Sequence, residues 1–134
     1  MTGEEFFRVF DISGSGLNAE RVRLAVVANN LANAETTQTP EGGPYRRRHV
    51  IFSTLLGELA GVTVKGVVSS DAAPRMVYNP GHPDADEKGF VAMPDIKVPL
   101  EIIDLLTASR AYEANLAAMN NFKRICEETI QLLR

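Results

Sequence analysis

A seven-residue apolar repeat in the last third of the chain limits the fold more than any other feature of the sequence. Alternate steps of three and four residues select ten positions, of which only Ser109 and Lys123 are not apolar. These positions are Ile102, Leu105, Ser109, Tyr112, Leu116, Met119, Lys123, Cys126, Ile130 and Leu133. Such a repeat predicts a long helix that packs along one side against another helix. Proline suits a first helical turn, so we expect this helix to run from about Pro99 to Leu133.

The N-terminal segment, from Phe6 to about Asn33, carries a weaker form of the same repeat. Its main row consists of Phe10, Leu17, Leu24 and Leu31, and Phe6 and Val27 fill part of a second row. The polar residues Ser13 and Glu20 interrupt that second row. Gly14 and Gly16 each cost about 1 kcal/mol relative to alanine inside a helix. We therefore expect a helix that is weak alone and pairs with the C-terminal helix as a coiled coil.

The segment between the two helices, from about Thr36 to Lys97, has a different character. It contains seven of the ten glycines and six of the seven prolines, which excludes a long helix. Short β-favouring runs lie between these residues, at 49–52, 62–68, 75–78 and 90–93. The sequence thus predicts an α+β fold, in which residues 1–35 and 99–134 form a helical domain and residues 36–98 a small β-rich insert. Because a lone helix pair buries little surface, we expect the insert to be the more ordered part before assembly.

Charge and hydropathy disfavour several kinds of partner. A net charge of −3 and a pI near 5.4 provide no basic surface for nucleic acid, whose phosphates bind clustered lysine and arginine. The longest apolar stretch, Leu24 to Ala28, is far shorter than the roughly 20 residues that span a membrane. The first ten residues are acidic and lack the apolar core of a signal peptide, so we expect no cleavable signal. Cys126 lies within the apolar repeat, which favours a packed thiol over a reactive one.

One glycine-rich motif suggests nucleotide chemistry but lacks the required context. Residues 14–19 match the dinucleotide fingerprint in its alanine-ended form, and Glu35 stands where a ribose ligand would be expected. A phosphate-binding loop follows a buried strand, whereas here the helical repeat runs straight through the glycines. We therefore expect a chance match and no cofactor. No spacing of nucleophile and base calls for a catalytic triad either, so we expect neither an enzyme nor a small-molecule substrate.

The polar run at residues 82–89 is similar to part of a calcium-binding loop. Asp84, Asp86 and Gly89 occupy the first, third and sixth positions of an EF-hand. Lys88 replaces an oxygen ligand, and Asp95 replaces the bidentate glutamate at the twelfth position. A hairpin loop shaped by proline and glycine explains the run better. A soluble Ca²⁺-binding module is kept as the alternative function.

Three consecutive arginines, Arg46, Arg47 and Arg48, precede the first predicted strand. Successive side chains of a strand point to opposite faces, so the three cannot converge on one anion. A solvated edge or a contact with another subunit is the expected role.

The end of the first helix is unusually rich in asparagine. Asn29 and Asn33 share one helix face, Asn30 lies between them, and Leu31 continues the apolar row. Asparagine commonly ends helices, because it tolerates the left-handed conformation. One asparagine would satisfy that role, whereas three favour a recognition surface whose amides pair with the backbone of a neighbouring subunit.

At this asparagine run the chain resembles the flagellar rod, hook and filament-junction proteins. The shared motif is Ala-Asn-Asn-Leu-Ala-Asn-Ala at residues 28–34. Three further stretches make the chain similar to the flagellar basal-body rod protein C family of the proximal rod. They are residues 43–47, residues 78–86 with Gly89 and Met93-Pro94, and residues 109–115. The Gly-Ser-Gly sequence at residues 14–16 departs from the family pattern and puts the straightness of the first helix in question. The resemblance covers essentially the whole chain.

The resemblance implies a structural subunit of the axial rod that crosses the periplasm and transmits torque to the hook. Its implied partners are other copies of the chain, other rod proteins and the flagellar type III apparatus, which would export it without cleavage. The terminal helices would lie in the core layers of the rod, with the β-rich part outside them. The expected assembly-interface residues are Leu17, Leu24, Asn29, Asn30, Leu31, Asn33, Leu105, Tyr112, Asn115, Leu116 and Met119.

Overall fold

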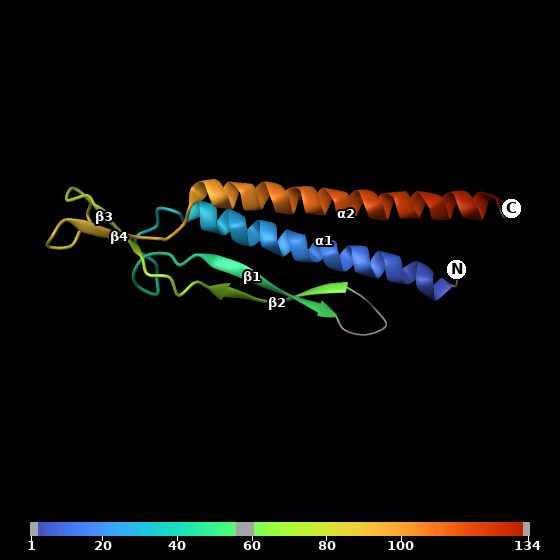
Figure 1. Cartoon of the computed structure of the whole chain (residues 1–134), viewed down its shortest axis with the longest axis horizontal. Coiled ribbons are helices and arrows are strands. Elements are labelled where there is room, and N and C mark those ends of the chain that lie inside the picture. Colours follow the sequence, from blue (N-terminus) through green and yellow to red (C-terminus); the bar gives the residue numbers. More distant parts are fainter. Residues whose placement is uncertain (1–2, 56–60, 133–134) are drawn as a thin grey trace.

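The computed structural model describes residues 3–55 and 61–132, which form two long helices and two β-hairpins. The elements are α1 (Gly3–Ala32), β1 (Arg48–Leu55), β2 (Gly61–Ser69), β3 (Arg75–Tyr78), β4 (Phe90–Met93) and α2 (Val98–Leu132). Figure 1 shows an elongated molecule in which α1 and α2 run antiparallel, with both chain ends at the same end of the pair. The predicted α+β fold with paired terminal helices is confirmed.

The first helix continues without a break through Gly14 and Gly16. At Gly14 a Cβ would meet no atom within 4 Å apart from the adjacent residues and the nearby backbone of α1 itself. At Gly16 a Cβ would lie 3.0 Å from the side-chain nitrogen of Asn115 on α2. The absence of a side chain at Gly16 therefore permits a close approach of the two helices. Nearer the chain ends, Phe10 and Phe122 hold the pair together edge to face, with ring centroids 5.3 Å apart.

The side of α2 that packs on α1 differs in part from the predicted apolar row. The inward positions, all buried or half-buried, are Glu101, Leu105, Ala108, Tyr112, Asn115, Met119, Phe122 and Cys126. They keep the four-three spacing and share every second position with the prediction. At other predicted positions the preceding residue lies inward instead, as Glu101 and Asn115 do. Ile102 and Leu116 are therefore exposed, at 45% and 38%. Leu133 and the side chain of Phe6 lie outside the described residues.

The predicted β-rich insert consists of two separate two-stranded antiparallel sheets. The β1–β2 hairpin, bent by an irregularity between Ile51 and Phe52, lies along α1. The β3–β4 hairpin projects beyond the helix pair, at the end away from the chain termini (Figure 1). The predicted bounds of β3 and β4 are confirmed, whereas β1 and β2 are longer than their predicted runs.

The apolar core is small for a chain of this size. A cluster of Ala34, Tyr45 and Ile96 joins the end of α1 to the segments that lead into β1 and α2. Few large apolar side chains of the described residues are buried, and many are exposed on both helices. In the described part of the chain, neither helix has a stretch apolar enough to cross a membrane.

Candidate assembly interface

Three consecutive residues of α1 face three different surroundings. The Ser15 hydroxyl accepts a hydrogen bond from the backbone nitrogen of Val62 on β2, at 3.1 Å. Gly16 faces Asn115 of α2. Leu17, about 100° further round the helix, is half-buried. One side of α1 thus holds the hairpin, the next holds α2, and the third carries Leu17.

The contact of α1 with α2 at Gly16 is repeated along α1 at intervals of seven residues. Arg23 and Asn30, which follow Gly16 at this interval, hydrogen-bond to Asp104 and Glu101 of α2. Leu24 and Leu31 follow them by one residue, as Leu17 follows Gly16, and both are half-buried. The three leucines therefore share one flank of α1, beyond its contact with α2.

On α2, Ile102 and Leu116 follow the inward residues Glu101 and Asn115 by one position. Because the two helices run antiparallel, the residue that follows an inward position lies on the same side of the pair on both helices. The β1–β2 hairpin lies on the opposite side of the pair, because it contacts Ser15, which precedes the inward residue Gly16 instead of following it. We call this surface the outer face; it comprises Leu17, Leu24, Leu31, Ile102 and Leu116.

Four other expected interface residues lie in the seam between the helices. Leu105, Tyr112, Asn115 and Met119 are half-buried at inward positions of α2. Their packing therefore serves the helix pair within one chain. Only the edge of each side chain that remains exposed is available to a neighbour.

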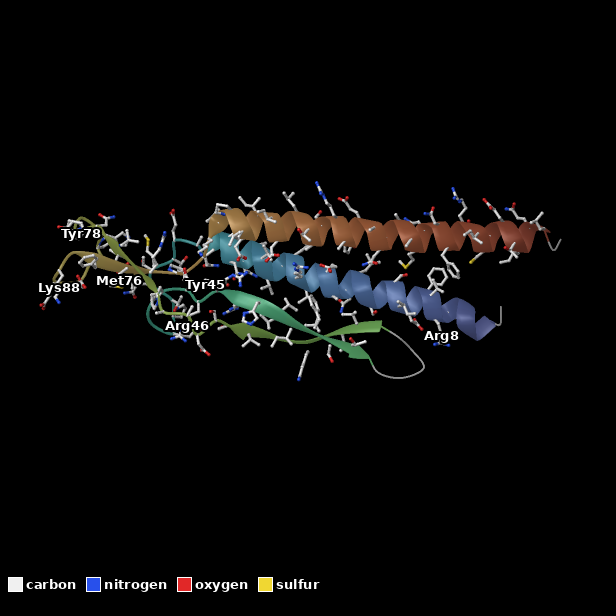
Figure 2. The ribbon with its side chains drawn as sticks, in the orientation of Figure 1. Arg8, Tyr45, Arg46, Met76, Tyr78 and Lys88 are labelled. Carbon is white, nitrogen blue, oxygen red and sulfur yellow. The ribbon has the colours of Figure 1, made fainter. Side chains whose placement is uncertain are left out.

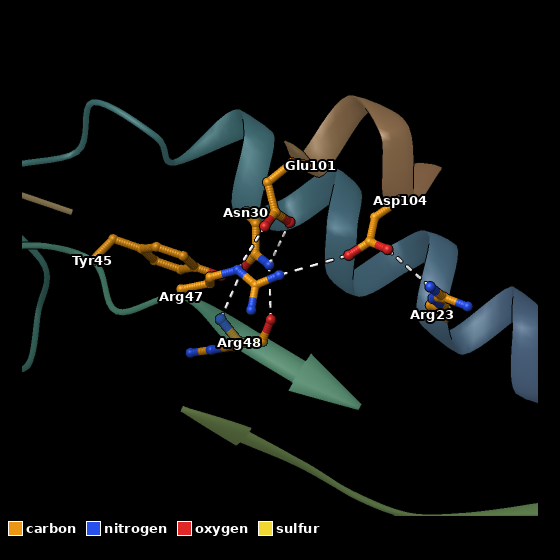
Figure 3. Close-up of polar contacts among 7 residues, drawn as sticks. All are labelled: Arg23, Asn30, Tyr45, Arg47, Arg48, Glu101 and Asp104. Carbon is orange, nitrogen blue, oxygen red and sulfur yellow. Dashed lines mark hydrogen bonds and ion pairs between the residues drawn. The ribbon is translucent and has the colours of Figure 1, made fainter. Parts of the chain in front are cut away.

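The expectation that Asn30 serves a neighbouring subunit is wrong, because its side chain is fully buried within the chain. The amide nitrogen donates to the backbone oxygen of Arg48 at 2.7 Å and to Oε2 of Glu101 at 3.0 Å. The amide oxygen accepts from the backbone nitrogen of Arg48 at 2.9 Å and from the Tyr45 hydroxyl at 3.1 Å. All four hydrogen-bonding positions of the amide are therefore occupied (Figure 3).

Glu101 is the carboxylate at the centre of this network, and its residue is 1% exposed. Nε of Arg47 donates to its Oε1 at 2.6 Å. The same guanidinium lies 3.7 Å from Oδ2 of Asp104, whose Oδ1 accepts from Arg23 at 2.9 Å. A buried carboxylate requires such partners, because an isolated charge in a protein interior is strongly unfavourable. The network joins α1, α2 and the segment before β1 (Figure 3).

Tyr45 closes the network on the side of the loop before β1. Burial raises the pKa of its phenol, which therefore stays protonated and donates to Asn30. The guanidinium of Arg48 lies over the ring, 5.6 Å from its centroid, at a distance suited to a cation–π contact.

The three arginines diverge, as the strand geometry predicts, but Arg47 is neither at a solvated edge nor free for a subunit contact. Its side chain is 35% exposed and reaches across to α2. Arg46 is largely exposed, 3.9 Å from Asp71. No signal in the linear sequence marks Arg47 as a partner of Glu101, because 54 positions separate them.

The other two asparagines make local contacts near the end of α1. Asn29 is exposed and donates to the backbone oxygen of Ala25 at 2.9 Å. Asn33 donates to the backbone oxygen of Asn29 at 2.8 Å and accepts from Thr36 at 3.2 Å. These bonds satisfy groups at the end of a helix, as a cap does. The exposed surface of Asn29 remains available to a neighbour.

The loop at residues 82–89 is the turn of the β3–β4 hairpin, as the sequence favours. Oδ1 of Asp86 accepts from the backbone nitrogens of Lys88 and Phe90, at 2.9 and 2.8 Å. Asp84 accepts from Thr37 at 2.7 Å. Within the described residues, no group of three or more His, Cys, Asp or Glu side chains is placed to hold a metal ion. Nothing in this geometry supports the calcium alternative.

An elongated helix pair with exposed apolar side chains and a small core is typical of a subunit of a larger assembly. Residues 10–38 match the family model described as flagella basal body rod protein. The chain is 42% identical to the flagellar basal-body rod protein FlgC of Escherichia coli O6:H1, over 92% of this chain and 95% of that protein. It is 33% identical to FlgC of Borreliella burgdorferi, over 96% of this chain and 97% of that protein.

The chain belongs to the FlgC family of flagellar basal-body rod proteins. It is a structural subunit of the basal-body rod, and the family consists of rod proteins, which points away from enzymatic activity.

Proposed function

We propose that this subunit enters the rod by packing the outer face of its helix pair against the terminal helices of neighbouring subunits. The observation that carries the proposal is that only every second position of the apolar repeat on α2 packs against α1. The other half of the repeat lies outside the chain's own core. Ile102 and Leu116 are exposed at 45% and 38%, and Leu106, on the same flank, at 54%. Apolar side chains exposed along one flank of a helix favour an interaction site there.

Energetics favour neighbours of the same helical type as the occupants of this face. Each square ångström of apolar surface removed from water contributes roughly 25 cal/mol, and the isolated chain leaves much of this contribution unrealised. Helices that pack knobs into holes would cover the leucines at the seven-residue spacing that the face presents. The neighbours would be other copies of this chain and other rod proteins.

The wider role follows from the family. The assembled rod would be the drive shaft that crosses the periplasm and transmits torque to the hook, with this subunit in its proximal part. Residues 1–35 and 99–134 would form the inner layers, and residues 36–98 the outer part. The thin core supports export through the flagellar type III apparatus in an unfolded state, without cleavage of a signal, because little packing must be undone for passage.

A substitution on the outer face tests this proposal. Leu116→Asp places a carboxylate in the proposed contact, where burial of an unpaired charge costs several kcal/mol. We expect normal levels of the protein in cells, loss of swimming, and absence of the chain from purified basal bodies. Asn121→Asp is the matched control, because Asn121 is exposed on the side of α2 away from α1. Normal swimming with Leu116→Asp would contradict the proposed interface.

A further inference from the structure

The projecting β3–β4 hairpin carries an apolar surface that the chain itself does not cover. In its register Tyr78 pairs with Phe90 and Met76 with Ala92, so these four side chains share one face of the hairpin. Met76, Tyr78 and Phe90 are 54%, 65% and 38% exposed. We call this surface the tip face. The opposite face is packed, since Val91 is 1% exposed.

The tip face is held rigidly. The rings of Tyr78 and Phe90 meet edge to face, with centroids 5.3 Å apart. Gly89 has a φ of +80°, and a Cβ there would lie 3.0 Å from the ring of Tyr78. Asp86 ties down the turn through its bonds to the backbone of residues 88 and 90. A preordered aromatic surface loses little entropy on binding, which favours its use as a contact.

The chemistry and size of the tip face limit what can occupy it. None of its four residues is charged, so an apolar surface is the fitting partner. Four side chains are far fewer than the roughly 20–30 residues per side of a stable interface between two proteins. The tip face therefore suits a partner that another contact already holds in place, as in a polymer.

A second apolar region lies at the other end of the molecule. Val9 on α1 is 37% exposed there, and Ile125, Ile130 and Leu132 on α2 are 54%, 62% and 87% exposed. Figure 2 shows Met76 and Tyr78 at one end of the long axis and Arg8 near the opposite end. The molecule thus exposes apolar side chains at both ends of its long axis, on a hairpin at one end and on two helices at the other.

We propose that the tip face of one rod subunit docks on the free end of the helix pair of the next subunit along the rod. A contact between unlike patches at opposite ends repeats without closing and produces a filament. The partner is an antiparallel helix pair with apolar residues around its open end, of the kind this chain displays. This inference rests on the proposed function and adds an axial contact to the lateral one made by the outer face.

Photo-crosslinking in swimming cells tests the axial contact. A photoreactive phenylalanine analogue replaces Tyr78 or Met76, and mass spectrometry identifies the joined peptides. We expect crosslinks to the terminal helical segments of a rod subunit. The analogue at Val77, on the opposite face, should give none. An absence of crosslinks, or crosslinks only to other parts of a rod subunit or to proteins that are not rod subunits, would overturn the proposal.

A competition experiment separates this inference from the proposed function. A chain with Tyr78→Ser and Phe90→Ser competes with the wild-type chain for incorporation into basal bodies. Loss of two aromatic contact residues predicts about a tenfold smaller incorporated fraction, with unchanged thermal unfolding of the helices. If this variant incorporates normally while Leu116→Asp does not, the tip contact is wrong and the outer face stands. If Leu116→Asp also incorporates normally, the proposed function fails.

Discussion

The side-chain amide of Asn30 hydrogen-bonds to both the backbone nitrogen and the backbone oxygen of Arg48, at 2.9 and 2.7 Å. The amide thereby pairs with the first residue of β1 as an adjacent strand would, although it belongs to a helix. This pairing fixes the β1–β2 hairpin relative to α1. Through Glu101, the same side chain fixes the end of α1 relative to α2. One asparagine thus contacts all three elements.

Asn30→Ala should destabilise the isolated subunit by about 2–4 kcal/mol, because it leaves part-buried backbone groups of Arg48 and a buried oxygen of Glu101 without their Asn30 partner. Thermal or denaturant unfolding of the purified protein measures the effect. Asn33→Ala is the control and should cost about 1 kcal/mol or less, as loss of a helix-end contact does. If Asn30→Ala impaired rod assembly while leaving monomer stability unchanged, Asn30 would serve a neighbour after all.

Arg47→Met should be strongly destabilising, by roughly 3 kcal/mol, because the buried carboxylate of Glu101 loses its cationic partner. Partial exposure of Arg47 keeps the effect below that of a fully buried pair. Adding Glu101→Gln to Arg47→Met should restore much of the loss, since no buried charge then remains. Denaturant unfolding of the two single variants and the double variant measures this coupling. Additive effects would show that the two side chains do not act together.

Gly14 and Gly16, both in the interior of α1, should respond differently to alanine. Gly14→Ala should stabilise the protein by up to about 1 kcal/mol, because a helix favours alanine and the site is open. At Gly16 the new methyl group would press on Asn115, so the gain should vanish or become a loss. Thermal unfolding of both variants provides the comparison. Equal stabilisation by the two substitutions would show that Gly16 does not mediate a close helix approach.

Hydrogen exchange on a confirmed monomer should show a gradient along the helices. Amides near Asn30 and Glu101 should be the most protected, together with the adjacent part of β1, because the buried network lies there. Amides in the outer turns of α1 and α2 should exchange fast, since neighbours would complete their packing. This refines the expectation that the β-rich insert is more ordered than both whole helices. Strong, uniform protection of both helices would contradict the expectation that neighbouring subunits complete the packing of their outer turns.

The sequence by itself determined the elements and the class of the protein. The repeats placed α1 and α2 to within a few residues, and β-favouring runs bounded by glycine and proline placed β3 and β4. These assignments succeed because periodicity and turn chemistry act over short stretches of chain. The motifs near Asn30 and Tyr112 indicated the rod family for the same reason, since they are local.

Only the tertiary structure decided which side of each apolar stripe faces inward. The apolar repeat selected Ile102 and Leu116, whereas the structure places their polar neighbours Glu101 and Asn115 inward. The choice depends on partners distant in sequence: Glu101 is 71 positions from Asn30 and 54 from Arg47. The carboxylate of Glu101 can lie inward because the amide of Asn30 and the guanidinium of Arg47 bind it there. With Glu101 inward, the residues of the outer face lie outside the seam between the helices.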